Sequence, residues 1–189
     1  MSLIRFKTNF GFMKFKWLLF STFFIIAVHA QKDKRVEASQ FTLDVFLPGA
    51  SYEMGIAENS TISLSGALGF AYRESAFFES GYGVYPIIVG QYRYYYNFQR
   101  RLDRDKRIKG NTGNYLAPTI FVQGGNPIIG NLEATNLVGL AAVYGIQRTG
   151  KKGFQWNFNV GPSVYRDDFG TEFGIFLDFK LGFVLGYNR

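Results

Sequence analysis

The sequence predicts an all-β chain, an antiparallel up-and-down transmembrane β-barrel of about eight strands preceded by a cleaved signal peptide. Aromatic residues make up 19% of the 189 residues and Gly contributes 22, a composition that suits sheets packed on lipid. Several segments alternate apolar and polar residues with a period of two, whereas no stretch after residue 30 keeps a convincing helical period. The first thirty residues differ from the rest in both charge and hydrophobicity.

Residues 1–30 have the organisation of a secretory signal peptide. Basic residues precede an apolar run at residues 17–28, and the small residues Val28 and Ala30 fit the site that a signal peptidase recognises. A transmembrane anchor is the alternative, but the run has about a dozen residues where roughly 20 are needed to cross a bilayer. We expect cleavage near Ala30/Gln31, with Met1 or Met13 as the initiator. Residues 31–189 are then one barrel domain.

Removal of residues 1–30 changes the chemistry available to the chain. It takes away four of 21 Lys and Arg residues and none of 14 Asp and Glu residues, so the formal net charge falls from +7 to +3. No zinc, helix-turn-helix or RNP-like pattern remains, so we expect no nucleic-acid partner. The only histidine, His29, leaves with this segment, and cysteine is absent. We therefore expect no enzymatic activity, cofactor or metal.

Eight alternating runs separated by turn signals define the expected strands. The first two runs are the least regular, and the fifth is weak because Pro118 lies inside it. In the last run, only Phe176 and Val184 interrupt the small or polar face. Between the first two runs we expect a type II turn, with Gly49 at positive φ. In chain order the expected strands are 36–46, 51–56, 62–72, 91–98, 115–123, 138–146, 154–160 and 173–187.

The second face of these strands decides what the sheet encloses. Between the large apolar residues lie mostly Gly, Ala, Ser, Asn and Gln, as at residues 155, 157 and 159. Such side chains fit the narrow lumen of an eight-stranded barrel, whereas a soluble barrel would carry Lys, Glu and Thr outside. We expect the large apolar residues to face lipid, where a sheet must close to pair its backbone groups. The alternative is a soluble lipocalin-like periplasmic binding barrel.

Four charged residues, Glu53, Arg93, Asp178 and Lys180, fall on the face expected to line the lumen. Charges there are costly unless paired, so we expect a lumenal charge network. We favour a structural role, because an eight-stranded lumen is normally filled by its own side chains. The alternative is a path for protons or ions.

A basic connection follows the fourth expected strand, and Asp103 and Asp105 offset part of its positive charge. If Arg189 lies in the periplasm and strands alternate in direction, we expect this connection in the periplasm and the loops at 74–83 and 124–136 outside the cell. A solvated charged turn is the simpler interpretation, and contact with lipid phosphates is the alternative. Its basic residues are Arg100, Arg101, Arg104, Lys106, Arg107 and Lys109.

Two stretches resemble known outer-membrane proteins. Lys180, Gly182, Leu185 and Tyr187 follow the pattern of the C-terminal sorting label that the barrel assembly machinery reads, although two residues follow the aromatic. The stretch 91–117 is similar to a segment of small, largely uncharacterised outer-membrane β-barrel proteins of Gram-negative bacteria. The resemblance implies the eight-stranded architecture of OmpA/OmpX-type barrels and a place in the outer membrane, and carries over no catalytic or binding residues.

Together these features predict a non-enzymatic outer-membrane β-barrel with a side-chain-filled lumen and a structural or surface-interaction role. A narrow channel or small-solute port is the first alternative, and the soluble lipocalin-like barrel is the second. The expected partners are outer-membrane lipids and, during biogenesis, the barrel assembly machinery. The sequence predicts no oligomeric state.

Overall fold

The computed structural model describes residues 35–74 and 80–187, which belong to the compact unit Lys34–Arg189. The expected signal peptide and its cleavage site lie outside the described residues. The described residues form one short helix, α2 (Phe98–Leu102), and nine strands. The strands are β1 (Ser39–Asp44), β2 (Gly49–Ala57), β3 (Ser60–Arg73), β4 (Gly81–Tyr94), β5 (Gly113–Gln123), β6 (Ile129–Gly130), β7 (Leu137–Thr149), β8 (Phe154–Arg166) and β9 (Thr171–Val184).

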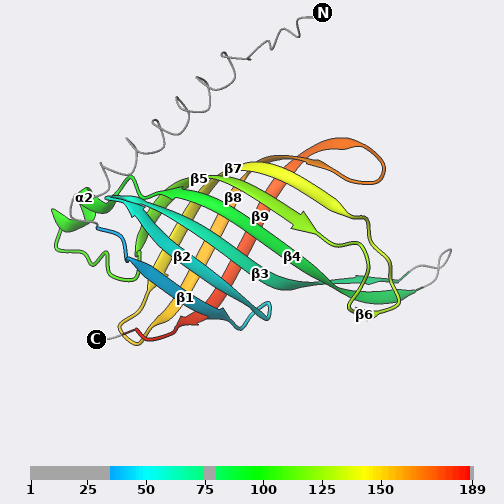
Figure 1. Cartoon of the computed structure of the whole chain (residues 1–189), viewed down its shortest axis with the longest axis horizontal. Helices are drawn as coiled ribbons and strands as arrows, with labels where there is room; N and C mark the ends of the chain where they lie inside the picture. Colours follow the sequence, from blue (N-terminus) through cyan, green and yellow to red (C-terminus); the bar gives the residue numbers. More distant parts are fainter. Residues whose placement is uncertain (1–34, 75–79, 188–189) are drawn as a thin grey trace, which may run out of the picture. The chain divides into compact units, whose positions relative to one another are not determined.

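Eight of the strands close into an antiparallel ring (Figure 1). Successive strands pair with one another, and β1 completes the ring by pairing with β9 through Thr42↔Val184 to Asp44↔Gly182. The two-residue strand β6 lies outside this ring and pairs only with the start of β4. The prediction of an all-β, up-and-down antiparallel sheet of about eight strands is confirmed. We call the space that the ring encloses the lumen.

Side chains alternate between the lumen and the outside of the ring because successive residues of a strand point to opposite faces. In β1, Gln40, Thr42 and Asp44 are buried, while Phe41 and Leu43 are exposed. The same pattern places 19 polar or charged residues among the buried residues that the structure describes, against ten apolar ones. The polar face therefore lines the lumen, and the large apolar residues lie outside.

The strand expected at 91–98 has different bounds in the structure. β4 begins at Gly81 and ends at Tyr94, after which the chain turns into α2. The alternation is lost at this turn, so Phe98, which the pattern placed on the apolar outer face, is fully buried against Tyr95. The expected strand overran its end because Tyr94, Tyr96 and Phe98 keep a period of two beyond the last sheet residue.

Two proline-containing segments also differ in detail from the expectation. The weak fifth run is a full strand, β5, and Pro118 pairs with Ala142 of β7. On its other side, the β4–β5 pairing is interrupted at Pro118, which has no N–H to donate. The expected type II turn is wrong: Gly49 has no positive φ and already belongs to β2. A Cβ at Gly49 would instead clash with β3, which explains the glycine.

The connections gather at two ends of the ring. At one end, Tyr95 N donates to Asn59 O, and Gly110 N donates to a carboxylate oxygen of Glu37. At the other end, Asn136 N donates to Asp168. The first, called the α2 end, comprises residues 35–38, 57–60, 95–112, 148–153 and 184–187. The second, called the loop end, comprises the described residues 45–48, 73–74, 80–81, 124–136 and 166–171.

Candidate functional site

A buried ion pair lies in the lumen, near the end of β4 that leads to α2. Nη1 of Arg93 in β4 lies 3.0 Å from Oε2 of Glu53 in β2, and both side chains are at most 5% exposed. The two residues meet because β2 and β4 both flank β3 and direct these side chains inward. The guanidinium also donates to Gln147 and Gln91, at 3.0 and 2.9 Å. Each buried charge therefore has charged and polar partners.

The carboxylate of Glu53 accepts further hydrogen bonds. The hydroxyls of Thr61 and Tyr95 donate to Oε1 at 2.6 and 2.8 Å, and Gln147 donates to Oε2 at 3.2 Å. Burial raises the pKa of Tyr95, which lies one residue beyond β4, well above its ordinary value. Its hydroxyl therefore keeps its proton and remains a donor to Glu53.

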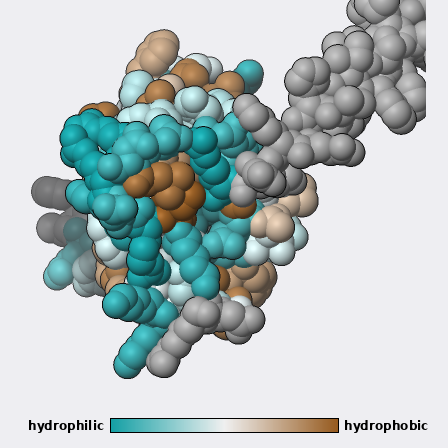
Figure 2. All heavy atoms as spheres, turned by 90° about the vertical axis from the view of Figure 1, so that its left-hand side faces the viewer, coloured by the Kyte–Doolittle hydropathy of each residue, from teal (hydrophilic) through white to brown (hydrophobic). Residues whose placement is uncertain are grey.

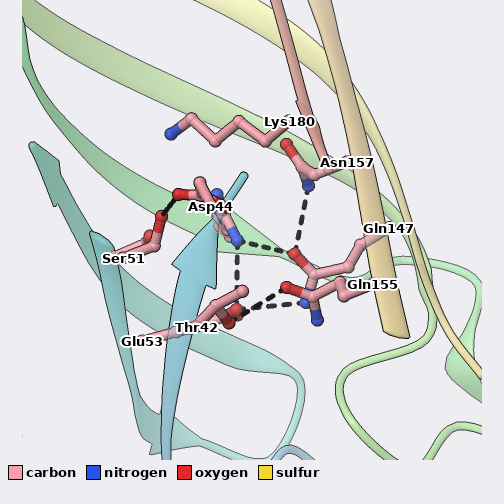
Figure 3. Close-up of a pocket in the computed structure, with 10 residues that line it drawn as sticks. Thr42, Asp44, Ser51, Glu53, Gln147, Gln155, Asn157 and Lys180 are labelled. Carbon is pink, nitrogen blue, oxygen red and sulfur yellow. Dashed lines mark hydrogen bonds and ion pairs between the residues drawn. The ribbon is translucent and has the colours of Figure 1, made fainter. Parts of the chain in front are cut away.

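A layer of amide side chains from β7 and β8 lies beside the Glu53 carboxylate (Figure 3). Asn157 donates to the oxygen of Gln147 at 3.0 Å and to the hydroxyl of Tyr115 at 2.8 Å. The Tyr115 hydroxyl donates in turn to Asn159 at 2.6 Å. The guanidinium of Arg93 lies 4.8 Å from the centre of the Tyr115 ring, within the range of a cation–π contact. Side chains from β4, β5, β7 and β8 are thus joined across the lumen.

A second pair, Asp178 and Lys180, lies on β9. Nζ of Lys180 is 3.7 Å from Oδ2 of Asp178 and donates to Ser65 at 2.6 Å. Asp178 also accepts from Asn159 at 2.9 Å, which links this pair to the amide layer. All four charged residues predicted for the lumen do lie there. They form two pairs bridged by amides rather than one cluster of charges.

Side chains fill the lumen at three levels. The cavity between the two ion pairs is only about 10 Å³, room for about one water molecule. Toward the α2 end, Phe98 and Tyr95 stack with ring centres 4.6 Å apart. Toward the loop end, the rings of Phe121 and Phe176 lie 5.0 Å apart. A polar layer therefore lies between two pairs of aromatic rings.

The basic connection between β4 and β5 forms part of the α2 end. Arg101 donates through Nε and Nη2 to the carbonyl oxygen of Arg107, at 3.1 and 2.9 Å. Arg107 donates to the Tyr187 hydroxyl at 2.9 Å, and Nζ of Lys109 lies 5.2 Å from the centre of the Tyr187 ring. The remaining three predicted basic residues are exposed and form no salt bridge with any described residue; they are Arg100, Arg104 and Lys106.

The α2 end is more basic than the connection alone. It carries ten Lys and Arg residues against four Asp and Glu residues, whereas the described part of the loop end carries two against four. Figure 2 views the α2 end and shows hydrophilic residues gathered around a small apolar spot. Arg148, Lys151 and Lys152 come from the β7–β8 region and were not part of the sequence prediction. They are brought to the connection by the pairing of β7 with β5.

The residues of the predicted sorting label do not share one surface. Lys180 and Gly182 face the lumen, and a Cβ at Gly182 would clash with the carbonyl oxygen of Leu43 in β1. Leu185 is exposed beyond the end of β9, and Tyr187 contacts Arg107. Gly182 therefore has a structural reason in the closure of the ring, and Lys180 has one in its lumenal contacts with Ser65 and Asp178.

Several lumenal residues were missed by sequence reasoning. Arg93 donates hydrogen bonds to Gln91 and Gln147 and lies over the ring of Tyr115. Tyr115 and Gln147 lie far from Arg93 in the sequence. The alternation of amides at 155–159 was the available signal, since it placed Asn157 and Asn159 on the lumenal face. Their individual partners depend on the register of the closed ring.

Among residues 35–74 and 80–187, no three His, Cys, Asp or Glu side chains come together as a metal site would require. No helix in this part of the chain is long and apolar enough to cross a membrane. Comparisons with protein-family models, curated proteins and solved structures found no match to this chain.

Proposed function

We propose that this chain is a non-enzymatic β-barrel protein of a Gram-negative outer membrane, with a structural or surface-interaction role. In this proposal, residues 1–30 are a signal peptide, and residues 180–187 serve the barrel assembly machinery as a sorting label. The observation that carries the proposal is the distribution of polarity, which is the reverse of that in a soluble barrel. Ion pairs and amides lie in the lumen, and large apolar side chains lie outside. No catalytic step is part of the proposal.

The outer face of β9 illustrates why lipid is the better surrounding. Phe173, Ile175 and Leu177 alternate along the strand and are 89%, 78% and 67% exposed. Contiguous apolar surface of this kind is unfavourable in water and is normally covered by a partner or by lipid. β9 pairs with β8 along its length, and its end at Gly182–Val184 pairs with β1 to close the ring, so the strand belongs to a closed sheet of the kind that a membrane requires.

The contents of the lumen favour a sealed barrel over the two alternatives. A soluble binding barrel would need an apolar interior cavity, but the lumen contains Arg93, Glu53 and amide side chains. A channel would need a continuous path for solute, but only about 10 Å³ is free between the ion pairs. The ring pair toward the α2 end and the ring pair toward the loop end occupy further space in the lumen.

Reconstitution into phospholipid vesicles and planar bilayers tests the proposal. We expect the protein to remain with the vesicles after alkaline carbonate extraction and to produce no stepwise conductance. Recovery in the soluble periplasmic fraction of the producing cells would contradict the membrane location. Reproducible conductance steps would instead establish the channel and contradict the sealed lumen.

A further inference from the structure

A groove of about 570 Å³ lies where the outer face of β7 and β8 meets the α2 end. It combines two kinds of side chain. The aromatic residues Phe154 and Trp156 come from the outward-facing positions of β8. The basic residues come from the β4–β5 connection and from the end of β7, and they are Arg101, Lys106, Arg107 and Arg148.

The guanidinium of Arg148 is held in place at the edge of this groove. Nη1 donates to the carbonyl oxygen of Gly113, and Nη2 donates to Oδ1 of Asn114, both at 2.7 Å. The guanidinium carbon also lies 6.0 Å from the centre of the Trp156 ring, which is directly opposite in the β7–β8 pairing. A cation fixed beside a tryptophan is the arrangement that suits a membrane interface.

Arg101 is also positioned rather than free to move with solvent. It is anchored to the carbonyl oxygen of Arg107, and partial burial lowers its pKa. Asp105 is the acidic residue among those lining the groove, and it forms no salt bridge with a described residue. The basic side chains therefore outnumber the acidic one, and the lining of the groove carries a net positive charge.

We propose that this groove binds the phosphate headgroup of an anionic phospholipid in the adjacent leaflet, with an acyl chain lying along Phe154 and Trp156. This inference rests on the membrane location proposed above. Charge complementarity and the neighbouring apolar outer face identify the occupant. The sequence pattern pointed to the six basic residues of one connection, whereas the groove uses three of them together with Arg148 from another strand.

The test uses the fluorescence of Trp156 in the full chain. The sequence contains two tryptophans, Trp17 and Trp156, so Trp17→Phe leaves one reporter whether or not residues 1–30 are removed. The protein is reconstituted in phosphatidylcholine vesicles containing a small share of acyl-brominated phosphatidylglycerol or acyl-brominated phosphatidylcholine. Bromine quenches tryptophan fluorescence on contact. The ratio of quenching by brominated phosphatidylglycerol to quenching by brominated phosphatidylcholine therefore measures the lipid preference at the groove. We expect about a fivefold preference for phosphatidylglycerol.

Two matched double variants locate the site. Arg101→Gln with Lys106→Gln removes two positive charges that line the groove, and the preference should fall toward one. Arg100→Gln with Arg104→Gln removes the same charge from the same connection outside the groove, and the preference should be retained. An equal loss in both variants would contradict the assignment to this groove.

The remaining outcomes separate this inference from the proposed function. Insertion with equal quenching by both lipids would overturn the headgroup site and leave the membrane location standing. A fluorescence change with inorganic phosphate in uncharged detergent, without lipid preference in vesicles, would assign the groove to a free anion and contradict lipid docking. Failure to enter vesicles, with no quenching by either lipid, would overturn the membrane location and the site together.

Discussion

At the scale of single residues, Arg93 connects several strands through its contacts in the lumen. It pairs with Glu53, donates to Gln91 and Gln147, and lies over the ring of Tyr115. Such a cation is costly to bury, and its partners become costly if it is removed. Its role in this account is to join strands across the lumen.

Arg93→Leu should therefore destabilise the barrel rather than merely alter conductance. It leaves the Glu53 carboxylate buried without its cation, a loss of about 3–5 kcal/mol in the free energy of unfolding. Urea unfolding of the reconstituted protein measures this loss. Glu53→Leu combined with Arg93→Leu should recover part of it, because no unpaired charge remains. An unchanged urea midpoint for Arg93→Leu would rule out the structural role.

At the scale of elements, the seam between β1 and β9 closes the ring through only a few residue pairs. Gly182 lies in this seam opposite Asp44, and an added Cβ would meet the carbonyl oxygen of Leu43. Gly182→Ala should lower the stability by about 1–3 kcal/mol through crowding of the seam. Gly66→Ala in β3 is the control, because no atom lies within 4 Å of its added Cβ. Equal urea midpoints for the two variants would contradict this explanation.

The helix α2 contributes to the barrel chiefly through Phe98, which is fully buried and stacks on Tyr95. Phe98→Ala should cost about 3–5 kcal/mol because it leaves a cavity beside the ring of Tyr95 at the α2 end. Phe169→Ala is the matched control, since Phe169 is 85% exposed between β8 and β9. Thermal unfolding in detergent measures both. A comparable loss for the two substitutions would argue against a packing role for α2.

The elements also show where sequence reasoning succeeds. Alternation predicted the inward and outward faces of β8 and β9 because side chains in a strand repeat every two residues. It overran the end of β4, since Tyr96 and Phe98 continue the period by chance into α2. The two-residue strand β6 was not predicted, because so short a segment has no period of its own.

At the scale of the whole molecule, the candidate site was predictable only in part. The pattern placed Glu53, Arg93, Asp178 and Lys180 on the lumenal face, but it did not show that β2 and β4 flank β3 and so bring Glu53 to Arg93, while Asp178 and Lys180 pair within β9. The groove beside Trp156 was not predictable, because Arg101 comes from a connection and Arg148 from the end of β7, and these segments meet only in the folded chain. Contacts between distant segments leave no local signal.

The distribution of charge distinguishes the two ends of the ring. The α2 end is basic, and the described part of the loop end carries more acidic than basic residues. If the proposed outer-membrane location is correct, the expected alternation of strands would put the α2 end in the periplasm and the loop end at the exterior. Basic side chains beside the inner leaflet are attracted to anionic headgroups, which agrees with the proposed lipid groove.

The ring of eight strands should form a closed barrel that is stable in a membrane environment. Electrophoresis of the detergent-solubilised protein in SDS, with and without boiling, tests it most directly. A closed barrel with paired backbone groups and a cross-linked lumen should resist SDS, so the unboiled sample should migrate faster than the boiled one. Identical migration of the two samples, with the protein recovered in the soluble periplasmic fraction, would contradict the account and favour a soluble barrel.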